Sequence, residues 1–259
     1  MKKTGVLLAL PAVIFLIVFF FAPFVFLIIK SFQSNIGILT LQNYLKVLTD
    51  TFYIKISLYS LEIALITTLL CILISYPASY YLVHVVSDKY RGLVLAILIS
   101  PFWIDFLIRA YALKAFFFPL GIKEGFFTLI YGMVYDYFLF MLLPLYASMT
   151  GVSKTIINAA RIQGASGLTL ARKIVIPLTI PGLVAGSTIV FMMSLTEFVI
   201  PAMLGGTFGY TLGYAIYDLF FIYRDIYRGS ALSVIISALS LLVAYYYIKK
   251  TRGRGGIFA

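Results

Sequence analysis

Charged residues, cysteine and histidine are all scarce in this sequence. Only 11% of the 259 residues are charged, and there is one cysteine, Cys71, and one histidine, His84. A single cysteine excludes a disulfide framework and a cysteine-based zinc or iron–sulfur site. A single histidine excludes a metal site built from several histidines, so we expect no metal site in this chain.

Nucleotide-binding and catalytic motifs are also absent from the sequence. No G-x4-G-K-[ST] stretch is present, so the chain cannot hold nucleotide phosphates in a P-loop. Neither G-x-S-x-G nor H-E-x-x-H occurs. We therefore expect no catalytic residues, no cofactor bound by this chain, and no enzymatic activity of its own.

Apolar residues are present in large excess. They make up 63% of the chain, and the mean hydropathy is +1.06. A soluble domain contains roughly 45–50% apolar and about 25% charged residues, so this excess is too large for one buried core. The composition predicts an all-α polytopic membrane protein. The net charge of +11 then reports membrane orientation rather than nucleic-acid binding.

Six apolar stretches are long enough to span a bilayer, which takes about 20 residues per helix. We place them at 6–29, 58–83, 93–106, 129–148, 183–204 and 231–248, within a single transmembrane domain of residues 1–259. The third is interrupted at Pro101 and could continue through Ala110 to Phe118. The first follows Lys2 and Lys3 and is too long for a cleaved signal peptide, so we expect it to be retained.

The basic residues predict the orientation. The loops 1–5, 84–92, 149–182 and 249–259 together hold 12 Lys and Arg residues against one acid, Asp88. Short cytoplasmic loops are rich in Lys and Arg, so we expect both termini to lie in the cytoplasm.

The loop 149–182 carries its own helical signals. Ser153 can cap a helix over 154–163, and Gly164 follows where a left-handed residue is needed. Ser166 can cap a second helix over 168–176, which we expect Pro177 and Pro181 to end. The result is a helical elbow projecting into the cytosol, or a helical hairpin lying on the membrane surface.

The residues of this loop resemble the "EAA" motif of ABC importer permeases. Asn158, Ala159 and Ala160 are followed at the motif spacing by Gly164, next to Ala165, and then by Ile174-x-Ile176-Pro177. Asn158 replaces the family's Glu and Ile176 its Leu. The resemblance implies that the elbow inserts into a cleft of a cytoplasmic ATPase subunit. The small side chains of Ala159 and Ala160 would let the surface of that subunit approach the helix closely.

Further stretches resemble the spermidine/putrescine branch of these permeases. They are Leu41-Gln42-Asn43-Tyr44, Pro101-Phe102-Trp103, the run from Leu107 to Lys114, and Glu197-Phe198-Val199-Ile200-Pro201. The resemblance implies the type I ABC importer (MetI-like) fold in a prokaryotic cell membrane and the import of polyamines. ATP and Mg would bind a partner ATPase, a paralogous second permease subunit would complete a heterodimer, and an external substrate-binding protein would deliver the substrate. No nucleic-acid partner is expected.

Four carboxylates in or near the apolar stretches are candidate ligands for a cationic substrate: Glu62, Asp105, Asp136 and Glu197. A charge at the bilayer centre costs at least ~2.5–3.5 kcal/mol, so such residues usually face a polar interior. We identify no Lys or Arg well inside a span to neutralise them. Glu197 is the leading candidate, because helical spacing would place it in a polar stripe with Ser187, Ser194 and Pro201. Trp103, two residues before Asp105, could hold an alkylammonium group by a cation–π interaction.

Each acid also has a simpler interpretation. Asp105 could pair with Arg109 four residues later, Asp136 could accept hydroxyl hydrogen bonds, and Glu62 could be hydrated near the surface. A permease of the same architecture for ferric ion or another small solute is the main alternative function. An ion channel would leave the elbow motif unexplained. A membrane enzyme using Asp136 and Glu197 as an acid pair would need both carboxylates at helix ends accessible from the cytoplasm, whereas we expect them in the outer half of the spans.

Overall fold

The computed structural model describes residues 10–11 and 13–252, and within these residues it is helical with no strand. Five helices are long and apolar enough to cross a membrane: Val13–Ser31, Thr51–His84, Phe126–Thr150, Gly167–Thr196 and Ile226–Tyr246. They confirm five of the six predicted spans, although the start of the predicted span 6–29 lies outside the described residues.

The third predicted span is a bent pair of helices rather than a straight one. Asp88–Trp103 and Phe106–Leu120 meet at 90°. The break follows Pro101, which lies in the short 3-10 helix η2 (Ser100–Trp103). Ile104 and Asp105 are extended, so the chain leaves one helix and begins the next in a new direction.

The chain divides into two compact units. The first unit is Met1–Lys55 with Ala215–Leu241, and the second is Ile56–Tyr214 with Leu242–Ala259. Two helices, α4 (Thr51–His84) and α13 (Ile226–Arg252), contribute to both units. The first unit further contains η1 (Ile17–Phe21), α2 (Ala22–Ser31), α3 (Gln42–Thr49), the end of α12 (Leu212–Tyr217) and η6 (Asp218–Ile222).

In the first unit, the stretch 41–44 ties α3 to the end of α2. The side-chain amide of Asn43 donates to the carbonyl oxygens of Ser31 and Gln33, at 2.9 and 2.8 Å. The Tyr44 and Ser31 hydroxyls are 2.6 Å apart. Carbonyls at a helix end have no partner within the helix, so Asn43 satisfies part of this end.

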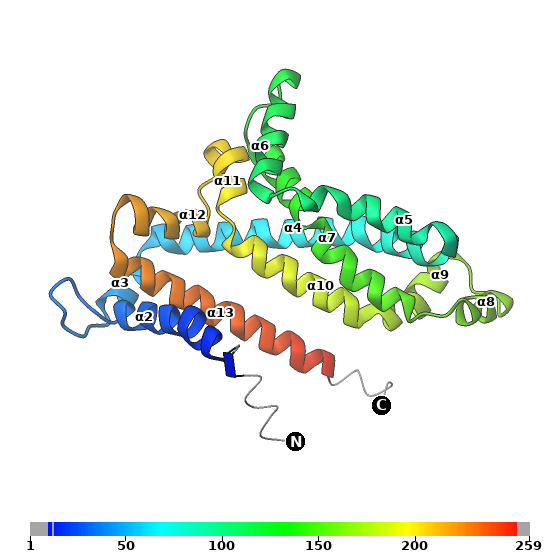
Figure 1. The fold of residues 1–259 in the computed structure, drawn as a ribbon, viewed down its shortest axis with the longest axis horizontal. Coiled ribbons are helices and arrows are strands. Elements are labelled where there is room, and N and C mark those ends of the chain that lie inside the picture. The colour runs from blue at the N-terminus through cyan, green and yellow to red at the C-terminus, as the bar shows by residue number, and fades with distance from the viewer. Residues whose placement is uncertain (1–9, 12, 253–259) are drawn as a thin grey trace. The chain divides into compact units, whose positions relative to one another are not determined.

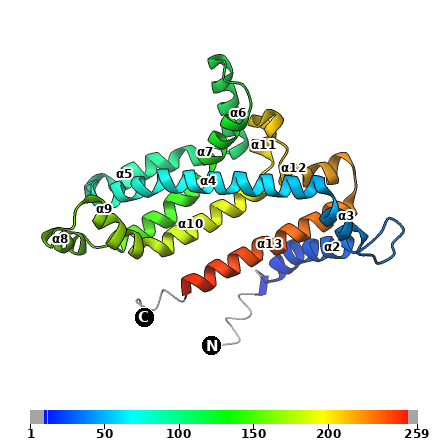
Figure 2. The ribbon, with the colours of Figure 1, turned by 180° about the vertical axis from the view of Figure 1, so that it is seen from behind.

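The second unit holds the remaining helices. They are α5 (Asp88–Ile99), η2, α6 (Phe106–Phe117), η3 (Phe118–Leu120), α7 (Phe126–Thr150), α8 (Lys154–Ile162), α9 (Gly167–Leu170), η4 (Ala171–Val175), α10 (Ile176–Thr196), α11 (Val199–Leu204) and η5 (Gly206–Phe208). Within this unit α4, α7 and α10 run side by side (Figure 1), and the view from behind in Figure 2 agrees. At the bend, α6 turns away from α5 and lies next to α11.

Small side chains hold these three helices together. Ser75 and Ser79 of α4 donate to carbonyl oxygens of α7, and both are buried. On α10, Gly182 faces the backbone of Pro144 and the side chain of Ser148 so closely that a Cβ atom there would overlap them. Small residues let membrane helices approach closely and gain dispersion energy.

We predict that Gly182→Val destabilises the protein, because the added side chain must push α10 away from α7. Overpacking of this kind costs about 1–3 kcal/mol. Gly92→Val on α5 is the matched control, since a Cβ atom at that position would have no neighbouring atom within 4 Å. The thermal unfolding midpoint of the detergent-purified protein measures both, and equal midpoints for the two variants would contradict this packing.

Candidate functional site

The bend before α6 places two of the predicted site residues at the surface. Asp105 is exposed, and its carboxylate caps α6 by accepting the backbone N–H of Leu107 at 2.9 Å. The Trp103 side chain is 85% exposed. The proposed pair of Asp105 with Arg109 is wrong, because Arg109 pairs with a different acid.

Arg109 forms an ion pair with Asp136. Their closest atoms, Nη2 and Oδ1, are 2.6 Å apart, and the two side chains are only 8% and 10% exposed. The expectation that no basic residue neutralises the four acids is therefore wrong for Asp136, and hydroxyl donors are not its principal partner. The reason is the bend, which carries α6 back against α7 and α11 instead of continuing the line of α5.

The guanidinium of Arg109 lies among aromatic rings and is incompletely hydrogen-bonded. Its centre is 4.3 Å from the ring centroid of Phe102 and 5.9 Å from that of Tyr135. Its Nε and Nη1 atoms are buried and have no hydrogen-bond partner. The space that Arg109 and Asp136 share with Gly132, Ile200 and Leu204 is too small for a water molecule.

Glu197 lies outside the helix in which it was predicted. Helix α10 ends at Thr196, and Glu197 has an extended backbone, with φ −66° and ψ 135°. The predicted stripe of Ser187, Ser194, Glu197 and Pro201 is therefore wrong, since the helical spacing stops before Glu197 and Pro201 belongs to α11. Ser194 is buried with no hydrogen-bond partner for its hydroxyl.

The carboxylate of Glu197 is used as a cap. Oε1 accepts the backbone N–H groups of Phe198, Val199 and Ile200 at the start of α11, at 3.0, 2.8 and 3.4 Å. Oε2 accepts the hydroxyl of Tyr137, which is buried in the core between α4, α7 and α10. Backbone N–H groups at a helix start favour a negative charge, so no cation is needed to stabilise Glu197 here.

Glu62 is exposed on α4, as the hydrated alternative expects. Its neighbours connect α4 to the segment after α11. The Ser60 hydroxyl accepts the backbone N–H of Leu212 at 2.7 Å, and the Tyr59 hydroxyl donates to the carbonyl of Phe208 at 2.9 Å. Among the four acids, Glu62 and Asp105 are therefore the exposed ones.

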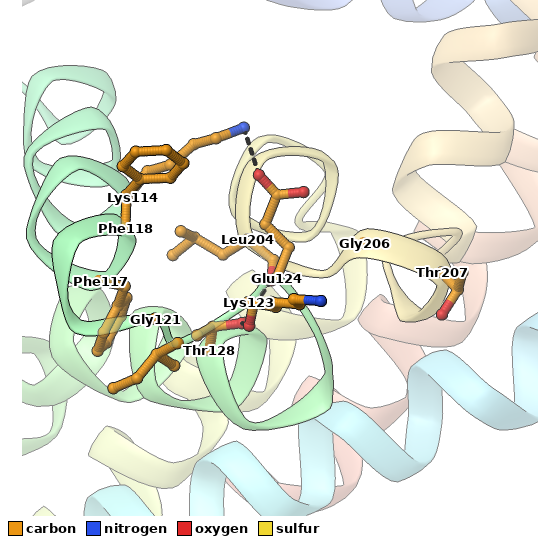
Figure 3. Close-up of a pocket in the computed structure, with 11 residues that line it drawn as sticks. Lys114, Phe117, Phe118, Gly121, Lys123, Glu124, Thr128, Leu204, Gly206 and Thr207 are labelled. Carbon is orange, nitrogen blue, oxygen red and sulfur yellow. Dashed lines mark hydrogen bonds and ion pairs between the residues drawn. The ribbon is translucent and has the colours of Figure 1, made fainter.

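A cavity of about 520 Å³ lies between the end of α6, the start of α7 and the segment after α11 (Figure 3). Glu124 is the only carboxylate among its eleven lining residues, and Lys114 pairs with it at 2.7 Å. Lys123 also lines the cavity. The lining thus carries two positive charges and one negative charge, which does not favour a cationic ligand.

The 149–182 loop begins as predicted. Ser153 caps α8 by accepting the N–H of Ile156 at 3.3 Å, and Gly164 has φ +83°. Both predictions are confirmed. Asn158 and Ala159 are exposed, whereas Ala160 is buried against the loop's own core, so Ala160 does not present a surface to a partner as expected.

The second helix of the loop does not end at the prolines. Ser166 precedes α9 but makes no side-chain cap, and the helix continues without a break from Gly167 to Thr196. The expected stop at Pro177 and Pro181 is therefore wrong. The π-helical segment η4 changes the hydrogen-bond register immediately before Pro177, which lies in the first turn of α10. Its missing N–H is tolerated at that position.

Two residues of the site were missed from the sequence. The sequence indicated Arg109 only as a partner of Asp105, and it indicated no role for Tyr137. The signal for Arg109 was its place within an apolar stretch, where a buried charge requires a partner. No local pattern indicates the bond from Tyr137 to Glu197, because it joins residues 60 positions apart.

Comparison with known proteins defines the class. Residues 72–251 match the family described as "Binding-protein-dependent transport system inner membrane component". The chain belongs to this family of ABC importer permeases, which are multi-pass transport subunits of the inner membrane.

Three curated relatives of this chain share the name PotB. The spermidine/putrescine transport system permease protein PotB of Escherichia coli (strain K12) is 34% identical over 92% of this chain and 94% of its own length. PotB of Salmonella typhimurium (strain LT2) is 34% identical over 92% and 90%. PotB of Haemophilus influenzae is 30% identical over 93% and 92%.

Solved structures confirm the permease fold. A chain of the bacterial alginate ABC transporter, in complex with its alginate pentasaccharide-bound periplasmic protein, superposes with a TM-score of 0.74 at 16% identity. The match covers 95% of this chain and 93% of that one. The MetNI methionine ABC transporter gives 0.60 at 18% identity, over 78% and 95%.

We predict that Glu197→Ala lowers stability by about 1–2 kcal/mol, because it removes the cap of α11 and the acceptor of Tyr137. Tyr137→Phe should cost less, since the cap remains. Glu197→Gln keeps an oxygen acceptor and should recover part of the loss. Thermal unfolding of the three purified variants measures this order. If Glu197→Gln is as stable as wild type but abolishes uptake, the charge itself acts in transport.

Proposed function

We propose that this chain is a membrane-spanning permease subunit that imports polyamines such as spermidine and putrescine. The observation that carries the proposal is the 34% identity to spermidine/putrescine permeases along 92% of the chain. The stretches 41–44 and 101–114 add support from the residues themselves.

The chemistry of the second unit suits a flexible polycation. Asp105 and Trp103 are both exposed at the bend, two positions apart in the sequence, and Glu62 is exposed on α4. A carboxylate can accept hydrogen bonds from an ammonium group, while an indole ring attracts it by a cation–π interaction of ~0.5–2 kcal/mol. We assign Asp105, Trp103 and Glu62 to the entry of the pathway, and Asp136 to its interior.

The energy for transport is proposed to come from a separate ATPase that binds ATP and Mg. The 149–182 loop would be its docking element, because Asn158, Ala159 and the adjoining apolar side chains of Ile162 and Leu168 are exposed, the last two at 88% and 78%. Exposed apolar side chains of this extent on a connecting loop favour a protein partner.

The remaining partners follow from membership of a binding-protein-dependent family. We propose a second permease subunit, paralogous to this one, and a substrate-binding protein on the outer face. The basic loops favour a cytoplasmic position for both termini in a prokaryotic cell membrane. The 149–182 loop would then lie on the same side as the ATPase.

Radiolabelled spermidine, putrescine and ferric ion would be offered to cells that lack this gene and to cells in which it is restored. We expect polyamine uptake to disappear on deletion and to return on restoration, with ferric uptake unchanged. Loss of ferric uptake alone would contradict the polyamine substrate and leave the permease architecture in place.

We predict that Gly164→Val uncouples the permease from its ATPase. A left-handed backbone costs a side-chain-bearing residue ~1–2 kcal/mol, and this strain lowers the ratio of correctly folded to misfolded elbow roughly 5- to 30-fold. Gly164→Asn is the matched control, because Asn tolerates this conformation best. Co-purification of the ATPase and uptake rates measure both variants. Equal, normal coupling in both would show that the turn is dispensable.

A further inference from the structure

Helix α6 carries the positive charges that neutralise two carboxylates of the second unit. Arg109 pairs with Asp136 in a buried position, and Lys114 pairs with Glu124 in a half-exposed one. Both acids belong to α7 or the segment just before it. The helix that holds these cations is attached to α5 through two extended residues at a 90° bend.

We infer that Arg109 is a tethered counter-cation of Asp136, which occupies this carboxylate until an ammonium group of the substrate replaces it. The inference rests on the proposed function, since it requires a cationic substrate. It assigns Arg109 a role in specificity: a permeating molecule must carry a positive charge to displace the guanidinium without leaving Asp136 unpaired.

The hydrogen bonding of Arg109 supports exchange rather than a permanent structural role. Only one of its nitrogens, Nη2, is bound to Asp136, while Nε and Nη1 are buried without partners. Buried donors of a purely structural arginine are normally satisfied, because each one left unpaired is unfavourable. This pair is thus less strongly fixed than its burial alone suggests.

Aromatic rings next to Arg109 can hold its guanidinium after it leaves Asp136. Phe102 lies 4.3 Å from it and Tyr135 5.9 Å, and both rings line an apolar groove of about 390 Å³ with Ile97, Leu98 and Phe138. A guanidinium can remain over an aromatic face when its carboxylate is taken by another cation. Release from Asp136 therefore does not leave Arg109 without a favourable contact.

In this conformation the Arg109–Asp136 ion pair has no free space beside it. The space bordered by Arg109, Asp136 and Leu204 admits no water molecule, so a substrate ammonium cannot bind beside Arg109 and must replace it. Exchange requires α6 to move relative to α7, and the non-helical Ile104 and Asp105 are the place where the chain can change direction between η2 and α6.

Binding of radiolabelled spermidine and putrescine to the purified permease–ATPase complex in nanodiscs, without the binding protein, tests the inference. Arg109→Gln removes the competitor, so we expect polyamine binding at least about tenfold tighter than in wild type, the effect of one charge-assisted hydrogen bond. Asp136→Asn should weaken binding by at least about tenfold. The double variant should bind polyamines as weakly as Asp136→Asn does. Because it removes both charges, its weak binding cannot be attributed to an unpaired buried charge.

Lys114→Gln is the matched control on the same helix. Its pair is half-exposed and therefore contributes little, so we expect binding to change by less than about twofold. If a single variant fails to fold, the double variant still tests whether Asp136 receives the substrate, because it removes both charges together.

Two results would overturn the inference. If the double variant binds polyamines as wild type does, Asp136 does not receive the substrate and the pair is structural. If Arg109→Gln folds but binds no more tightly than wild type, Arg109 does not compete. Failure of the proposed function is distinguishable from both, since deletion of the gene would then leave polyamine uptake unchanged.

Discussion

Polar groups within hydrocarbon must find their partners inside the protein, and the second unit is arranged around this constraint. Asp136 obtains a guanidinium from α6, and Glu197 obtains three backbone N–H groups and a tyrosine hydroxyl. Because both acids reach partners on other helices, they also determine where α6 and α11 lie against α7. The charges are therefore part of the packing.

The two acids satisfy this constraint in different ways. Glu197 is bound by backbone N–H groups at the start of α11, and these groups cannot leave it unless the start of the helix unwinds. Asp136 is bound by one long side chain, which can change its rotamer and retain an aromatic contact. A carboxylate held by a movable cation is suited to exchange with another cation, whereas a carboxylate held by backbone is suited to fixing a helix. This difference leads us to propose Asp136 ahead of Glu197 as a cation ligand, whereas the sequence placed Glu197 first.

Local signals allowed reliable prediction and long-range pairings did not. The spans follow from composition, and the start of α8 at Ser153 and the left-handed Gly164 follow from the chemistry of a cap and a turn. The 90° bend was indicated only as an interruption at Pro101, because proline predicts a break but not a direction. Without that direction, the partner of Arg109 could not be identified. Pro177 was misjudged since its effect depends on the register of the preceding turn, and η4 supplies a register that tolerates it.

Because the helix continues past Pro177, it connects the 149–182 loop directly to the segment at Glu197. Residues Gly167–Thr196 form one helix, which at ~1.5 Å per residue is about 45 Å long. One end leaves the 149–182 loop, and the other is followed directly by Glu197, the cap of α11. Since α11 packs against α6, the loop is connected to the helix that carries Arg109 through this long helix, the two non-helical residues Glu197 and Phe198, and α11. Had the prolines ended the helix as expected, a further break near the loop would have interrupted this connection. The difference therefore concerns more than a helix boundary, because the unbroken helix Gly167–Thr196 joins the 149–182 loop directly to the cap of α11, which packs against the helix that carries Arg109.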